Sequence, residues 1–139
     1  MFSHNDITKD LSRAKKFFED IVSFTVGPFS LDDIIHNRIN SINLIDVRDY
    51  NNYIDGHIPY AIHIPYKDEN FDAIDKSKVT IVYSYSDSCP RAYNTALKLI
   101  EKHFPAVVLR GGFKEWKKFD FDIVKTDSED YDEADKDNK

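Results

Sequence analysis

A short polar loop, residues 84–91, contains the side chains with the clearest chemical potential. The apolar, β-branched stretch 79–83 before it predicts a strand that is buried on both faces. After Pro90, apolar residues recur at three- and four-residue steps, which predicts a helix with proline in its first turn. In an α/β sheet, this order aims backbone N–H groups and the positive end of the helix dipole at one point beyond the strand. A nucleophile at the first loop position would lie in this anion cradle, and Ser84 occupies that position.

Cys89 is the only cysteine of the chain and the second candidate nucleophile. It stands beside Pro90 at the expected start of the helix, where the helix dipole favours a thiolate. The alternative, which we favour, is a partly buried thiol without a chemical role. Arg91 is the best candidate for attracting an anionic substrate, although a solvated surface role fits it equally well. The other expected members of the cradle are Tyr85, Ser86, Asp87, Ser88 and Pro90.

Three side chains outside the loop are candidates for supporting roles. Asp46 and Arg48, with Val47 between them, stand at the end of an apolar stretch. They could orient the loop through hydrogen bonds, but we favour a structural ion pair at the end of a strand. His57 could act as a general base, yet histidine in a Gly-His-Ile-Pro turn is more typical of a residue that fixes the backbone. His57 and His63 lack a third ligand in the pattern, so we expect no metal site.

Length, charge and cysteine content limit the class of protein. The chain has 139 residues and a net charge of −6, of which residues 127–139 carry −5. A nearly neutral body with an acidic tail argues against a nucleic-acid partner, which requires a basic patch. One cysteine excludes an intramolecular disulfide and a multi-cysteine zinc site. No apolar run is long enough for a membrane span or a signal peptide, so we expect a cytoplasmic protein with no membrane partner.

The remaining pattern predicts one α/β domain, residues 28–125, between a helical extension (1–27) and an acidic, disordered tail (126–139). An amphipathic helix is expected over residues 8–24. It could form a partner contact, including a homodimer, but we favour a helix folded back over the domain. Ser30 is the expected cap of the next helix, which ends near residue 37. Strands at 42–47, 61–64, 79–83 and 106–109 alternate with helices at 49–54, 90–104 and 113–118, which indicates a mainly parallel sheet.

Four blocks of this sequence resemble the single-domain form of the rhodanese-like sulfurtransferase family. They are residues 44–48 (LIDVR), residues 53–65 (YIDGHIPYAIHIP), the strand, loop and helix around residues 84–91, and residues 109–116 (LRGGFKEW). They occur in the order and spacing of the family, and the resemblance covers about residues 28–124.

The resemblance implies a three-layer domain with a five-stranded parallel sheet, helices on both faces and an active-site loop after the fourth strand. In active members the first loop residue is a cysteine. It takes sulfane sulfur from a small donor such as thiosulfate or a persulfide, holds it as a persulfide, and passes it to a thiol or cyanide. A thiolate and a persulfide are both anionic, so converging N–H groups stabilise them and no metal or organic cofactor is required.

Two departures from the family pattern stand out. Tyr60 replaces a usual glycine, which changes the chemistry of a turn. Counted from the strand, Ser84 occupies the position of the catalytic cysteine; counted from the helix, that position is Ser86. A serine hydroxyl stays protonated near neutral pH without a neighbouring base and forms no stable carrier of transferable sulfur. The chain is therefore either naturally silent at this position or a cysteine-to-serine variant of an active protein.

Three hypotheses about function are open at this point. The first is a rhodanese-type sulfurtransferase whose sulfur-bearing position is residue 84, with this chain a variant or one that relies on Cys89. The second is a catalytically silent rhodanese-like module that binds a partner or an anion through the intact cradle. The third is a phosphatase, because the same architecture with a longer loop can hold phosphate, although that chemistry also needs a cysteine at the start of the loop.

Overall fold

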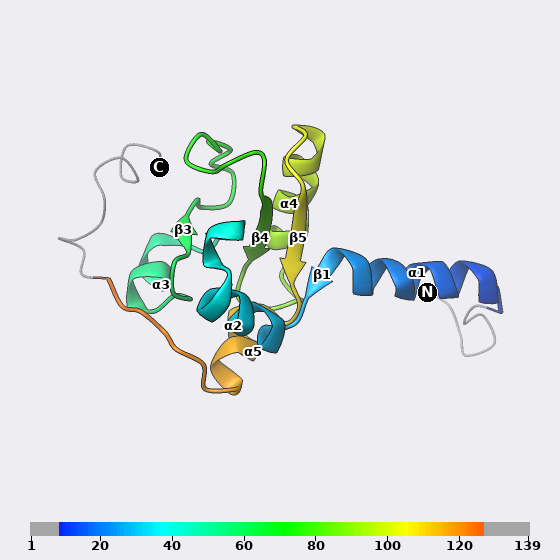
Figure 1. Ribbon diagram of the computed structural model, residues 1–139, viewed down its shortest axis with the longest axis horizontal. Coiled ribbons are helices and arrows are strands. Elements are labelled where there is room, and N and C mark those ends of the chain that lie inside the picture. Colours follow the sequence, from blue (N-terminus) through cyan, green and yellow to red (C-terminus); the bar gives the residue numbers. More distant parts are fainter. Residues whose placement is uncertain (1–8, 127–139) are drawn as a thin grey trace.

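The fold is a five-stranded parallel sheet with helices on both faces (Figure 1), as the sequence predicts. The computed structural model describes residues 9–126. The strands are β1 (Thr25–Val26), β2 (Ile42–Asp46), β3 (Ile62–His63), β4 (Val79–Tyr83) and β5 (Ala106–Leu109). They lie in the spatial order β1-β5-β4-β2-β3, so β4 is the central strand. The helices are α1 (Leu11–Phe24), α2 (Pro28–Asn37), α3 (Tyr50–Asp55), α4 (Arg91–Glu101) and α5 (Gly112–Lys118), with a 3₁₀ turn at Ile39–Ser41.

Two hydrophobic cores hold the layers together, one on each face of the sheet. On one face, α2, α3 and α5 pack against Ile81 and Tyr83 of the central strand, and Trp116 of α5 is fully buried among them. On the other face, α4 packs against Val82 together with Phe71 from the segment between β3 and β4. Alternate residues of β4 thus point to opposite cores, as the pleat of a strand requires. Because both faces are covered, the central strand is apolar along nearly its whole length.

Several predicted element boundaries differ from the structure by one to three residues, and one strand was not predicted. The pattern contained no sign of β1, which has only two residues and pairs with β5 at the edge of the sheet. Helix α2 begins at Pro28 rather than after Ser30, and its N-cap is Gly27. Proline is favoured at the first position of a helix because its fixed φ suits a helix and its missing N–H is not needed there. Tyr60, which replaces the family's usual glycine, has a left-handed backbone with φ of 71°.

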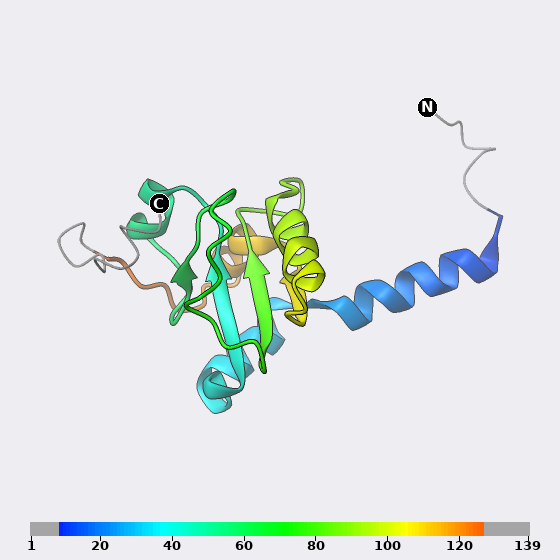
Figure 2. The same ribbon diagram turned by 90° about the horizontal axis from the view of Figure 1, so that it is seen from above.

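Helix α1 extends away from the domain, and the favoured prediction that it folds back over the domain is wrong. Both views show the helix pointing outward from the edge of the sheet (Figures 1 and 2). It has no buried residue, and Leu11 and Phe18 are 78% and 62% exposed. The chain passes from α1 directly into β1, and the pairing of β1 with β5 fixes this end of the helix at the sheet edge. Its apolar face is therefore left uncovered.

Among residues 9–126, no helix combines the length and the apolar character needed to span a membrane. The acidic stretch 127–139 and the first eight residues lie outside the described part of the chain. The prediction of a disordered tail therefore stays a prediction.

Candidate active-site loop

The loop between β4 and α4 lies where the sequence predicts it, at the carboxyl end of the central strand. Ser84 follows the last strand residue directly, and α4 begins at Arg91. Ser84 is only 2% exposed, so it forms the floor of the loop. Its hydroxyl donates to the Ser86 carbonyl at 3.5 Å, which is long for a hydrogen bond. Within residues 9–126 no carboxylate or imidazole contacts this hydroxyl, so no base activates it.

Several backbone amides of the loop are available to an anion. The Cys89 amide is not one of them, because it donates to the Ser86 carbonyl at 3.1 Å and closes a turn. The amides of Ser86, Asp87 and Ser88 have no acceptor among the residues that the structure describes. The first turn of α4 has no side-chain cap, and its first bond within the helix runs from the Asn94 amide to the Pro90 carbonyl. The earlier amides of α4 thus point along the helix axis toward the loop without an intrahelical acceptor.

The turn at Gly111 and Gly112 clamps the loop from the side of β5. The Phe113 amide donates to the Ser84 carbonyl at 2.9 Å, and the Lys114 amide donates to the Tyr85 carbonyl at 2.8 Å. Gly112 has φ of 64°, and a Cβ placed there would lie 2.7 Å from the Ser84 carbonyl oxygen. Only glycine permits both this backbone conformation and this close approach. The glycine pair of the 109–116 block therefore sets the position of the loop.

We expect Gly112→Ala to destabilise the fold by about 1–3 kcal/mol, because the added methyl group meets the backbone of the loop in a left-handed conformation. Urea denaturation of the two proteins measures this change. Gly27→Ala is the matched control. Gly27 has a negative φ and its nearest neighbour is the flexible end of Arg110, so we expect a change within about 1 kcal/mol. Equal losses of unfolding free energy in the two variants would contradict the claim that the close approach of Gly112 to the loop requires glycine.

Asp46 and Arg48 form a buried ion pair beneath the loop. The Arg48 Nη2 lies 2.7 Å from Asp46 Oδ2, and its Nε donates to the same carboxylate at 3.0 and 3.1 Å. Burial acts to lower the pKa of Arg48, but the hydrogen bonds and charge of Asp46 outweigh it and raise that pKa. The guanidinium also packs over the Phe113 ring at 4.0 Å and donates to the Gly56 carbonyl. The ion pair therefore supports Phe113, whose amide donates to the Ser84 carbonyl.

Tyr83, the last residue of β4, takes part in the same buried group. Its hydroxyl oxygen accepts a hydrogen bond from the Ile58 amide at 3.1 Å. Burial, followed by the nearby Asp46 carboxylate, raises its pKa well above the ordinary value for tyrosine. Tyr83 therefore stays neutral and serves the structure rather than acid–base chemistry.

His57 fixes the backbone in this structure and makes no hydrogen bond to Ser84. Its Nδ1–H donates to the Tyr53 carbonyl at 2.9 Å, and its ring stacks on the Tyr53 ring with centroids 3.9 Å apart. His63 stacks on the same tyrosine and donates from Nε2 to the Arg48 carbonyl at 2.7 Å. Within the described ranges, no group of three His, Cys, Asp or Glu side chains could hold a metal ion.

Burial lowers the pKa of His57 in the folded protein below that in the unfolded chain, although the hydrogen bond to Tyr53 opposes the shift. The unfolded chain therefore binds more protons at mildly acidic pH, and stability is lost as the pH falls below about 6.5. His57→Gln keeps an amide donor but does not titrate. We expect its free energy of unfolding to fall less between about pH 7.5 and pH 5.5 than that of the unchanged chain. Parallel pH profiles from urea denaturation would contradict this role.

Arg91 forms an ion pair on the surface instead of standing free beside the loop. Its Nη1 lies 3.3 Å from Asp49 Oδ1, and its guanidinium lies 5.6 Å from the centre of the Tyr66 ring. Asp49 precedes α3, but its side chain does not cap that helix.

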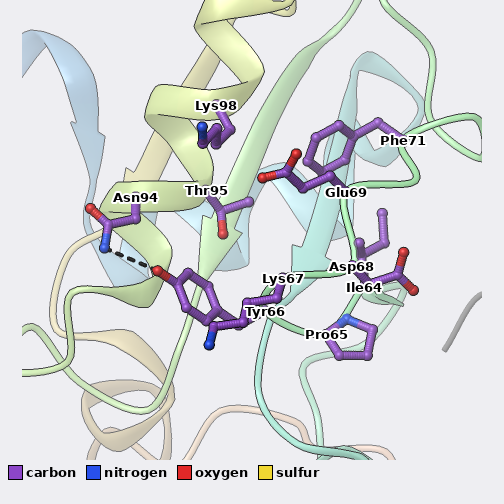
Figure 3. A pocket seen from close by; sticks show the side chains of 10 residues that line it. All are labelled: Ile64, Pro65, Tyr66, Lys67, Asp68, Glu69, Phe71, Asn94, Thr95 and Lys98. Carbon is purple, nitrogen blue, oxygen red and sulfur yellow. Dashed lines mark hydrogen bonds between the residues drawn. The ribbon is translucent and has the colours of Figure 1, made fainter.

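Tyr66 also accepts a hydrogen bond from Asn94 across a small pocket of about 80 Å³ (Figure 3). That pocket lies between α4 and residues 64–71 and contains none of the predicted site residues.

The loop itself borders two open clefts that contain basic side chains. Ser86, Asp87 and Ser88 line a cleft of about 530 Å³ together with Arg110 and Lys114. Asp87 and Glu115 add negative charge there, and the Asp87 carboxylate accepts from the Gly111 amide at 2.9 Å. Tyr85 lines the second cleft, of about 290 Å³, on the side of Arg48. The other charged side chains of this second cleft are Asp55, Lys117 and Lys125.

Arg110 and Lys114 border the loop although the sequence pattern did not predict them as site residues. Arg110 directly follows β5 and Lys114 belongs to α5, both far from the loop along the chain, and only the clamp brings them beside it. The signal was present in the 109–116 block, where both residues flank the glycine pair. A basic residue on each side of a turn that contacts the candidate loop is a natural candidate for binding an anion.

Comparison with known proteins relates this geometry to one family. A family model described as "Rhodanese-like domain" matches residues 31–119. No curated protein matches the chain significantly. Among solved structures, the BH2092 protein from Bacillus halodurans is 28% identical, with a TM-score of 0.75 over 83% of this chain and 86% of that one.

More distant structures share the fold. A rhodanese-like domain protein from Staphylococcus aureus is 19% identical, with a TM-score of 0.65 over 75% of this chain and 99% of its own. A thiosulfate sulfurtransferase from Pseudomonas aeruginosa is 16% identical, with a TM-score of 0.65. It matches 74% of this chain but only 20% of its own length, so the similarity concerns one part of a larger protein.

Proposed function

Because the chain belongs to the rhodanese-like domain family, we propose that it is a domain of the sulfurtransferase type that is catalytically silent, because serine occupies residue 84, the sulfur-bearing position. One observation carries the proposal. Ser84 is the first residue after the central strand, on the floor of a loop whose free amides and helix N-terminus favour an anion. With serine at this position, the unchanged chain binds a small anionic sulfur donor but does not transfer its sulfur.

The chemistry that this position would support needs a thiolate. A cysteine sulfur at residue 84 would attack the outer sulfur of thiosulfate, and the sulfur–sulfur bond of thiosulfate would break. Sulfite would leave with the electron pair of that bond, and the protein would hold a persulfide. A thiol or cyanide would then attack the outer sulfur of the persulfide and release the cysteine thiolate. Both protein-bound species are anions, so the same amides stabilise each of them.

Serine cannot perform these steps in this setting. Its hydroxyl would have to lose a proton, and no base among residues 9–126 contacts it. Its nearest polar partner is a carbonyl oxygen, which accepts hydrogen bonds and does not remove a proton at neutral pH. The catalytically silent state that we propose for this chain therefore follows from residue 84 alone, since the surrounding loop is intact.

The clefts on either side of the loop support a small anionic donor, thiosulfate or a persulfide. Arg110 and Lys114 border the cleft on the Ser86 side, where they can attract the donor. A thiol is the acceptor that we propose, because its thiolate is the nucleophile that sulfur transfer requires. Such chemistry needs a compartment where thiols stay reduced, so we propose a cytoplasmic location. The proposal includes no metal and no organic cofactor.

Cys89 is not the sulfur carrier in this proposal. It is only partly buried and lies in the turn at the far end of the loop, with its amide already bonded to Ser86. Sulfur transfer from thiosulfate to cyanide, assayed for the unchanged chain, Cys89→Ala and Ser84→Cys, tests this. We expect activity only from Ser84→Cys. Activity of the unchanged chain that disappears in Cys89→Ala would assign the role to Cys89 instead, and phosphate-ester hydrolysis by Ser84→Cys without sulfur transfer would favour a phosphatase.

A further inference from the structure

The apolar face of α1 has no partner in the described part of the chain. Leu11, Ala14, Phe18 and Ile21 recur at alternating steps of three and four residues, which is the spacing of a helix that packs against another helix. Phe17 and Val22 widen this face. Most of these large side chains are exposed, and an open surface hollow of about 450 Å³ is lined by Arg13, Ala14, Phe17 and Phe18. A contiguous apolar surface of this kind marks an interaction site.

The charges that border the apolar face divide the helix into two halves. Arg13 and Lys15 lie toward the amino end, and Glu19 and Asp20 lie toward the carboxyl end. With about 3.6 residues per turn, Lys15 and Glu19 border one edge of the apolar face, and Arg13 and Asp20 border the other. None of the four forms an ion pair within residues 9–126, so these charges are available to a partner.

We propose that the partner is a second copy of this chain, with the two α1 helices packed antiparallel. In an antiparallel pair related by a two-fold axis, each edge of one helix meets the same edge of the other. With the axis near Phe17, Lys15 lies opposite Glu19 of the partner subunit, and Arg13 lies opposite Asp20 of the partner subunit. A single alignment of the two helices therefore pairs opposite charges along both edges of the apolar face. The same register brings the apolar faces together and opposes the two helix dipoles.

A different apolar surface of the domain is a weaker candidate for the same role. The outer face of α4 exposes Tyr93, Leu97 and Ile100, which α1 of a second copy could cover. The charged residues beside this stripe toward the end of α4 are Lys98, Glu101 and Lys102, and Lys98 lies near Glu101 within the same helix. These residues are not divided into a basic half and an acidic half, which is the arrangement that makes α1 complementary to a second copy of itself. We therefore assign α1 to α1, and the face of α4 serves as the control.

Charge exchange along α1 tests the antiparallel register. We expect the full chain to sediment as a dimer, and Arg13→Glu with Lys15→Glu to raise the dimer dissociation constant at least about tenfold, by like-charge contacts on both edges. Glu19→Lys with Asp20→Lys is expected to do the same. The fourfold variant, in which both halves are exchanged, is expected to regain most of the affinity, because opposite charges face each other again. No regain in the fourfold variant would overturn the register.

Apolar substitutions test which surface forms the contact. Phe18→Asp is expected to give a monomer at concentrations where the unchanged chain is dimeric, and Leu97→Asp is expected to remain a dimer. Both side chains are exposed in the single chain, so neither change removes a core contact, and circular dichroism checks that each variant is folded. A monomeric unchanged chain would overturn the proposal. A dimer that resists Phe18→Asp but is lost in Leu97→Asp would also overturn it and assign the contact to α4.

Discussion

Ser84→Cys is expected to give thiosulfate:cyanide sulfur transfer at least about 100-fold above that of the unchanged chain, because the substitution supplies the missing nucleophile to an intact site. The loop amides, the start of α4 and the clamp from Phe113 are already in place around residue 84. A thiol is close in size to a hydroxyl, so the loop should accept it with little rearrangement. The initial rate of thiocyanate formation measures the gain.

Ser88→Cys is the matched control for this experiment. It adds a thiol to the same loop, but at an exposed position five residues beyond the end of the strand. We expect it to stay at the level of the unchanged chain, since it lacks the floor position that brings residue 84 under the amides. Comparable activity from the two variants would show that any thiol in the loop suffices, which is contrary to the assigned role of residue 84.

Asp46→Ala is expected to lower the free energy of unfolding by about 3–5 kcal/mol, because it leaves the buried Arg48 guanidinium without its counter-charge. Arg48 is 6% exposed, and its guanidinium makes three hydrogen bonds to this carboxylate, which also accepts from the Arg48 backbone amide. The contact with the Gly56 carbonyl and the packing over the rings of Phe113 and Tyr83 would remain, and none of these supplies a counter-charge. Urea denaturation at neutral pH measures the loss.

An exposed ion pair of the same chain provides the comparison. Asp33 and Arg38 lie 3.4 Å apart, with side chains 59% and 61% exposed. Asp33→Ala should change stability by no more than about 1 kcal/mol, because water already solvates both charges. If Asp46→Ala lowered the free energy of unfolding as little as Asp33→Ala does, the buried charge of Arg48 would not depend on Asp46, contrary to the expectation.

The buried pair connects stability with the site. Arg48 packs over Phe113, and the Phe113 amide holds the Ser84 carbonyl. When Asp46→Ala is combined with Ser84→Cys, we therefore expect activity below that of Ser84→Cys alone at temperatures where the protein remains folded. The rigid sheet end and the clamp act together to position the loop.

The sequence was sufficient for the elements that position the loop. The run at residues 79–83 is apolar because β4 is the central strand. The helix after Pro90 was predicted from an apolar spacing whose members Ala92 and Ala96 are buried. Two further members of that spacing, Leu97 and Ile100, are exposed. These signals are local, because an element that is buried on one or both faces has apolar residues at a regular spacing along its sequence. The position of Ser84 at the strand end followed from them.

Other features depend on contacts between distant segments, so no regular spacing of residues in the local sequence reveals them. Strand β1 has only two residues, too few for any alternation to be recognised, and its pairing with β5 decides where α1 points. The pairing of Arg91 with Asp49 and the approach of Arg110 to the loop join residues more than 20 positions apart. An amphipathic pattern shows that one face of α1 prefers to be covered, but not which surface covers it.

The most direct test of the account is the intact mass of the double variant Ser84→Cys, Cys89→Ala after incubation with thiosulfate. This protein has a single cysteine, so any sulfur it gains must be bound at residue 84. We predict a mass increase of one sulfur atom that cyanide removes as thiocyanate. A folded protein whose mass stays unchanged would contradict the assignment of residue 84 as the sulfur-bearing position.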